Sequence, residues 1–84
     1  MDGKKTDLLL NLDKLHTTRL GAERIKRNLG CEAADAVDCC RQLITAPDAF
    51  VTGKGKNLYA CSNGCLVTIN ASSFTIITAH RTKI

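Results

Sequence analysis

The sequence predicts an α+β fold, in which two to three N-terminal helices pack on one face of a three- to four-stranded antiparallel β-meander. Apolar residues recur at helical spacing as far as Pro47, and short β-prone runs follow from residue 49 onward. The links between these runs are tight, which favours antiparallel neighbours. With 84 residues, the chain is too short for a second core, so we expect a single domain over 1–84.

The first helix is expected to be capped by Thr6 and to continue to about Leu15, because Leu8, Leu12 and Leu15 share one stripe. The His16-Thr17-Thr18 segment should end it, since threonine favours a cap over a helix interior.

Two further helices are expected before Pro47. The second should run from Arg19 to Asn28, capped by one of the two preceding threonines and stopped by Gly30. The third should run from about Glu32 to Thr45, where Pro47 ends it. Its predicted apolar stripe is Ala33, Val37, Cys40 and Ile44.

Four β-prone runs are expected in the second half, separated by short turns: Ala49–Thr52, Asn57–Cys61, Cys65–Asn70 and Ser73 to about His80. A two-residue turn at Ala71-Ser72 would place Thr68 opposite Thr75. The face turned away from the helices would then be open and rich in hydroxyl groups. By its strand position His80 would lie on the apolar face, but at the end of the strand it could reach the rim of the sheet. That apolar face, packed under the helices, would consist of Val67, Ile69, Phe74 and Ile76.

The charge distribution favours an anionic partner. Residues 49–84 carry Lys54, Lys56, Arg81 and Lys83 and no acidic side chain, within a chain of net charge +4. No apolar run approaches the length of a membrane span, and no signal-peptide core follows the first residues. We therefore expect a cytoplasmic protein that does not enter a membrane.

The five cysteines are odd in number and follow no export signal, so free thiols are the expectation. Cys61 and Cys65 could lie within disulfide reach across a hairpin. Together with His80 they could instead supply three zinc ligands, an alternative to the expectation of no metal.

Several stretches of the chain resemble a family of small bacterial and phage-borne proteins described only as a domain of unknown function. The stretches are His16-Thr17-Thr18, Arg24–Leu29, Gly55–Tyr59, Thr68–Asn70 and Ser73–His80. The resemblance covers nearly the whole chain and implies no established activity.

A looser resemblance, in element order and residue types, links the chain to the small toxin ribonucleases that include barnase and the RelE-type toxins. Those enzymes cleave RNA without a metal or other cofactor. The resemblance would make His80 or His16 the acid/base group, Lys56 and Arg24 phosphate clamps, and Tyr59 a stacking surface.

Further ligand-binding candidates are Asn28, Lys54, Asn57, Thr68, Asn70 and Thr75. Each candidate also has an ordinary structural interpretation, such as a solvated turn for the lysines or a loop residue for His16. Two functions follow as hypotheses. In the first, the protein binds RNA or a nucleotide and, if it is an enzyme, cleaves the RNA. In the second, it is a phage or mobile-element inhibitor of a host defence system, which binds a host protein or nucleoprotein complex and catalyses no reaction.

Overall fold

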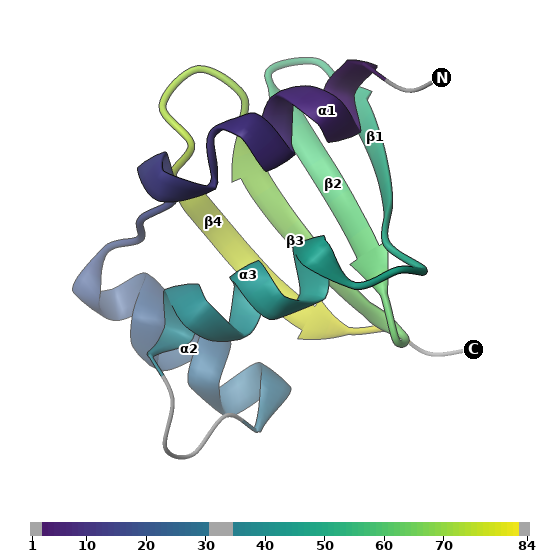
Figure 1. The fold of residues 1–84 in the computed structure, drawn as a ribbon. Helices are drawn as coiled ribbons and strands as arrows, with labels where there is room; N and C mark the ends of the chain where they lie inside the picture. Colours follow the sequence, from purple (N-terminus) through teal and green to yellow (C-terminus); the bar gives the residue numbers. More distant parts are fainter. Residues whose placement is uncertain (1–2, 31–34, 83–84) are drawn as a thin grey trace.

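The computed structural model describes residues 3–30 and 35–82, and in this part of the chain the helices precede a four-stranded sheet, as predicted (Figure 1). The α+β fold class is thereby confirmed. In chain order, the elements are α1 (Gly3–Leu10), the 3-10 helix η1 (Leu12–Lys14), α2 (Arg19–Leu29), α3 (Ala36–Thr45), β1 (Phe50–Lys54), β2 (Asn57–Ser62), β3 (Cys65–Asn70) and β4 (Ile76–Arg81).

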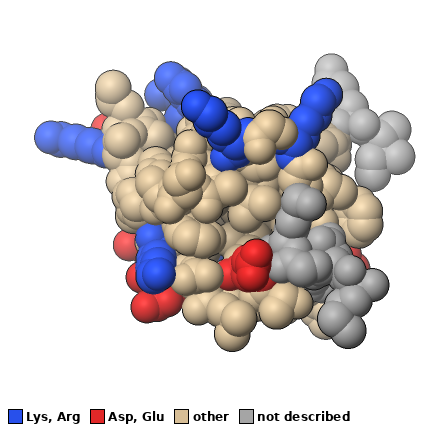
Figure 2. All heavy atoms as spheres, turned by 90° about the horizontal axis from the view of Figure 1, so that it is seen from above, with Lys and Arg blue, Asp and Glu red and all other residues tan. Residues whose placement is uncertain are grey.

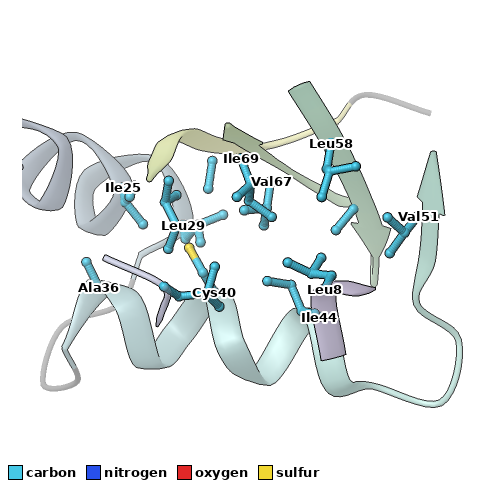
Figure 3. Packing of buried hydrophobic residues seen from close by; sticks show 14 residues of the cluster. Leu8, Ile25, Leu29, Ala36, Cys40, Ile44, Val51, Leu58, Val67 and Ile69 are labelled. Atoms are coloured by element: carbon cyan, nitrogen blue, oxygen red, sulfur yellow. The ribbon is translucent and has the colours of Figure 1, made fainter. Parts of the chain in front are cut away.

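The sheet has the strand order β1-β2-β3-β4 with every neighbouring pair antiparallel, which is the predicted meander. Helices α1 and α3 lie across one face of it, and α2 lies along the outer edge of β4 (Figure 1). Their buried side chains meet those of the strands in one core, which Figure 3 shows between helices and sheet. Fully buried members include Leu8, Ile25, Cys40, Ile44, Val51, Val67, Ile69 and Ile76.

The start and the end of α2 agree with the sequence prediction. The Thr18 side chain accepts a hydrogen bond from the Gly21 N–H at 3.0 Å, which satisfies a free donor of the first turn. Gly30 ends the helix with a φ of 72°, a left-handed conformation that glycine adopts without a steric penalty.

The first helix lies earlier in the chain than expected. It begins at Gly3, so Thr6 lies inside it instead of capping it. It ends at Leu10 instead of Leu15, and η1 follows it. Asn11 is the reason: its side chain donates to the Asp7 carbonyl at 2.7 Å, and its N–H bonds to Leu8 in the tighter spacing of a 3-10 turn. The described part of α3 begins at Ala36, with Asp35 as cap; the start predicted at Glu32 lies outside the described residues.

The predicted register between β3 and β4 is wrong. Thr68 lies opposite Thr78 instead of Thr75, and Ile69 lies opposite Ile76. The predicted two-residue turn is a longer loop, because the Asn70 side-chain oxygen accepts hydrogen bonds from the N–H groups of Ser72 and Ser73, at 2.9 and 3.0 Å. This side-chain bonding holds the chain in a loop where a strand was expected.

The longer loop changes which residues reach the core. Val67, Ile69 and Ile76 are buried under the helices as predicted, whereas Phe74 is half-buried beside the core at a φ of 59° and outside the strand. The ladder also shifts between Thr68 and Ile69, which leaves an extra residue in β4. That extra residue reverses the parity of the following positions.

Candidate nucleic-acid interface

The sheet face that the helices leave uncovered is built from residues that lie opposite one another on neighbouring strands. In an antiparallel ladder such residues share a face. Because Val51, Ala60, Val67 and Ala79 are buried on the helix side, their chain neighbours point to the other side. The middle row of this open face is Thr52, Tyr59, Thr68 and Thr78.

Two further rows flank the middle one and differ in chemistry. Toward the β1–β2 turn, the row consists of Lys54, Asn57 and Asn70. Toward the β2–β3 turn, it consists of Phe50, Cys61, Leu66 and His80. The open face thus has a polar, basic end and a more apolar end, with hydroxyl groups between them.

The basic end is continued by the two neighbouring turns. The Ala71 N–H donates to the Lys56 carbonyl oxygen at 2.9 Å, so the β1–β2 turn and the β3–β4 loop lie side by side. Lys54 and Lys56 are both exposed there. Figure 2 looks onto this end of the molecule and shows most of the basic side chains along one margin, away from the acidic ones.

The strands carry no acidic side chain that could neutralise these lysines, because residues 49–84 contain no aspartate or glutamate. Within the described residues, a salt bridge of 3.5 Å joins Arg41 and Asp38 on α3, on the helix side of the sheet. A phosphate at the basic end would therefore meet cations without repulsion from any carboxylate on the strands.

Two aromatic rings belong to the open face. Tyr59 is half-buried in the middle row, and Phe50 keeps 61% of its surface exposed at the apolar end. Exposed rings on a sheet with basic neighbours are the surfaces on which the bases of single-stranded nucleic acids stack.

The two groups predicted to act on one phosphate, His80 and Lys56, lie at opposite ends of this face. His80 is opposite Leu66, whereas Lys56 adjoins the row of Asn70. Leu66 and Asn70 are four residues apart along β3, a separation of about 13 Å at the rise of an extended strand. One phosphate cannot contact both ends, so the structure does not assemble the predicted acid/base and clamp pair.

The remaining candidates lie elsewhere. Thr75 is hydrogen-bonded to His16 in the loop before β4, at 2.9 Å. Asn28 donates to the Ala79 carbonyl at 3.1 Å and so holds α2 against the outer edge of β4, which is a structural role. Arg24 is exposed on α2.

Sequence reasoning missed five members of the open face: Phe50, Thr52, Cys61, Leu66 and Thr78. Phe50 and Thr52 could have been found, because they alternate with buried Val51 along a short strand. Thr78 could not, because the bulge after Ile76 shifts its parity and no residue in that segment signals a bulge.

The cysteine predictions need correction. Cys61 lies on the open face opposite Leu66, whereas Cys65 lies opposite Ser62 on the helix side. Side chains on opposite faces of a sheet can neither form a disulfide nor share a zinc ion, so the Cys61–Cys65 pair and the zinc site with His80 are both wrong. Cys40, Cys61 and Cys65 are free thiols, but Cys39 is in a disulfide, against the expectation of free thiols throughout.

These features define a small α+β protein in which helices cover one face of an antiparallel meander and the described residues leave the other face open. The chain belongs to the family described as Protein of unknown function (DUF3781), whose model matches residues 9–80. The matched segment includes β1, β2, β3, all of β4 except Arg81, and the His16–Thr75 contact. No curated protein and no solved structure matches the chain. Within the described residues, no helix has the length and apolar character needed to span a membrane.

Proposed function

We propose that the open face of the sheet binds single-stranded RNA. The observation that carries the proposal is one continuous face with lysines at one end, two accessible aromatic rings and no acidic side chain from any strand. Lys54 and Lys56 would hold phosphates, and Tyr59 and Phe50 would stack with bases. The accessible hydroxyl and amide groups between them, on Thr52, Asn57, Asn70 and Thr78, would contact base edges and ribose hydroxyls, whereas Thr68 is buried.

The geometry favours binding over cleavage at this face. Metal-independent cleavage needs a base at the ribose 2′-hydroxyl and a cation at the adjacent phosphate. His80 and the lysines lie too far apart for a single nucleotide to contact both. In an RNA strand that runs across the sheet, His80 would instead contact a different nucleotide.

Salt-dependent binding tests the electrostatic part. The anisotropy of a fluorescein-labelled RNA dodecamer would be measured with the full chain at several salt concentrations. We expect the double variant Lys54→Ala/Lys56→Ala to bind more weakly and to lower the slope of log affinity against log salt by about 1.4, since each phosphate contact to a single strand contributes about 0.7. Lys26→Ala, on α2, is the matched control for loss of a cation elsewhere.

Stacking is tested separately. Tyr59→Leu keeps an apolar side chain but removes the ring, and we expect it to weaken binding by roughly 5- to 150-fold, the equivalent of about 1–3 kcal/mol for one stacked base. The salt slope should stay unchanged, because no phosphate contact is lost. Incubation of RNA with the protein in EDTA, with and without His80→Ala, shows whether cleavage accompanies binding.

A protein partner is the second candidate, favoured by the apolar end of the same face, where Phe50 is mostly exposed beside Leu66 and Cys61. Under this alternative the protein would be a phage or mobile-element inhibitor that occupies a host protein or nucleoprotein complex. If neither the lysine variants nor Tyr59→Leu change the affinity for RNA, the RNA proposal is rejected in favour of this alternative.

A further inference from the structure

A histidine and a threonine far apart in the sequence meet beside the first residues of β4. The Nε2 atom of His16 lies 2.9 Å from the Thr75 hydroxyl oxygen, and its Nδ1 atom lies 2.9 Å from the Lys14 carbonyl oxygen. Backbone bonds hold the two residues in place, because the His16 N–H donates to Phe74 and the His16 carbonyl accepts from Ile76, at 3.3 and 2.7 Å.

The partners of the ring determine its tautomer. A carbonyl oxygen only accepts hydrogen bonds, so the Nδ1 atom facing Lys14 carries the proton. In the neutral ring, Nε2 is then an acceptor, and the Thr75 hydroxyl donates to it. This is the arrangement of a hydroxyl nucleophile with a general base, and a third group, here the Lys14 carbonyl, fixes the orientation of the base.

The loop around Thr75 adds two features. The Ser73 hydroxyl lies 2.7 Å from the Thr75 oxygen, which leaves Thr75 surrounded by hydrogen-bonding groups on two sides. Phe74, between them, has a φ of 59°, a conformation that costs energy for a bulky residue. Such local strain is typical of turns that hold a reactive group in place.

The pair is accessible to a small molecule. His16 is exposed and Thr75 is half-buried. His16 also lines an open cleft of about 680 Å³ between the start of α2 and the start of α3. Ala22 and Val37 give this cleft an apolar wall, and charged side chains of both signs, Arg19 and Arg41 with Asp35 and Asp38, line the rest of it. The cleft therefore offers polar and apolar contacts to a small ligand beside His16.

From this geometry we infer a second activity, separate from RNA binding: Thr75 accepts the acyl group of an activated carboxylic ester, with His16 as general base. The Thr75 oxygen forms a bond to the carbonyl carbon as its proton passes to His16 Nε2. The bond from that carbon to the leaving oxygen then breaks, and the His16 proton goes to the leaving alkoxide. Water, deprotonated by His16, later releases the acid and restores the Thr75 hydroxyl.

The test uses p-nitrophenyl acetate with the full chain, followed by digestion and mass spectrometry. We expect one acetyl group that fragmentation assigns to Thr75 and that alkaline hydroxylamine removes, because it is an aliphatic ester. Acetyl groups on lysine are amides and resist this treatment. We expect His16→Gln, which keeps a hydrogen-bonding group but no base, to slow acetylation of Thr75 about 100-fold, within the range of a positioned general base.

Thr45→Val is the matched control, because the Thr45 hydroxyl donates to the carbonyl oxygens of Arg41 and Gln42 within α3, and its loss should leave the rate unchanged. Free imidazole should restore part of the reaction in His16→Gly. Thermal melting of each variant shows that it is folded. Acetyl groups found on amines alone, or an undiminished rate in folded His16→Gln, would overturn the inference.

Discussion

Arg81, at the end of β4, donates a hydrogen bond from its Nη2 atom to the carbonyl oxygen of Leu29 at 3.1 Å. The last carbonyl groups of a helix lack partners within the helix and carry partial negative charge. The guanidinium group satisfies one of them and ties the end of α2 to the edge of the sheet. A residue counted among the basic groups of the sequence thus has a structural role.

We expect Arg81→Ala to lower the free energy of unfolding by about 1–3 kcal/mol, as for the loss of a hydrogen bond to a charged group. Urea denaturation measures this value. Arg24→Ala removes an exposed cation from the same helix and should change stability by less than about 0.5 kcal/mol. Equal effects of the two substitutions would argue against a specific role for the Arg81 contact.

Two adjacent isoleucines at the start of β4 differ in burial, and this difference can be tested by substitution. Ile76 is 1% exposed, whereas Ile77 is 44% exposed. Ile76→Ala should cost about 2–5 kcal/mol, because it leaves a cavity in the core, and Ile77→Ala should cost far less. The register predicted from sequence likewise buries Ile76 and leaves Ile77 on the opposite face, so Phe74, which is half-buried instead of buried, is the residue that distinguishes the two registers.

Gly21 should tolerate alanine poorly, although alanine usually stabilises a helix by about 1 kcal/mol relative to glycine. A Cβ atom at this position would collide with the Thr17 hydroxyl oxygen, which is held in place by its bond to the Ile76 carbonyl at 2.9 Å. We expect Gly21→Ala to destabilise the protein in thermal melts. In a Thr17→Ala background, which removes the colliding oxygen and leaves the Thr18 hydroxyl oxygen at 3.1 Å, the same change should be much less destabilising.

The free thiols should differ sharply in reactivity. Burial raises the pKa of the Cys40 thiol from 9.0 to about 12, with Cys65 nearby as a smaller cause. Cys40 is therefore protonated at neutral pH and should resist iodoacetamide until the protein unfolds, whereas exposed Cys61 should react in the folded state. Alkylation of Cys40 as fast as that of Cys61 in the native protein would contradict the burial.

The same shift predicts a pH dependence of stability. The folded state binds the Cys40 proton more tightly than the unfolded chain does, so this contribution is complete below pH 9.0 and is lost as the pH rises toward 12. Cys40→Ala lowers stability at all pH values through lost packing. Relative to wild type, it should lose less stability between pH 9 and pH 11 in urea titrations.

The sequence by itself determined the order of the elements, the two ends of α2 and the absence of acidic side chains from the strands. Thr18 and Gly30 mark the ends of α2 through their own side chains and backbone preferences, which depend on few neighbours. The span of β3 was likewise predicted residue for residue, because its apolar alternation lies between two turn sequences. Such signals are local, so reading along the chain recovers them.

Only the tertiary structure decided which side chains meet. The Asn70 side-chain oxygen accepts hydrogen bonds from the N–H groups of Ser72 and Ser73, which lengthens the loop. The longer loop is accompanied by a shift in the β3–β4 register, and His80 thereby lies on the open face. The same loop brings Thr75 to His16, 59 residues earlier in the chain. A one-residue shift in a strand reverses the face of every side chain that follows, and the hydrogen bonds that select the shift form only when distant segments have packed together.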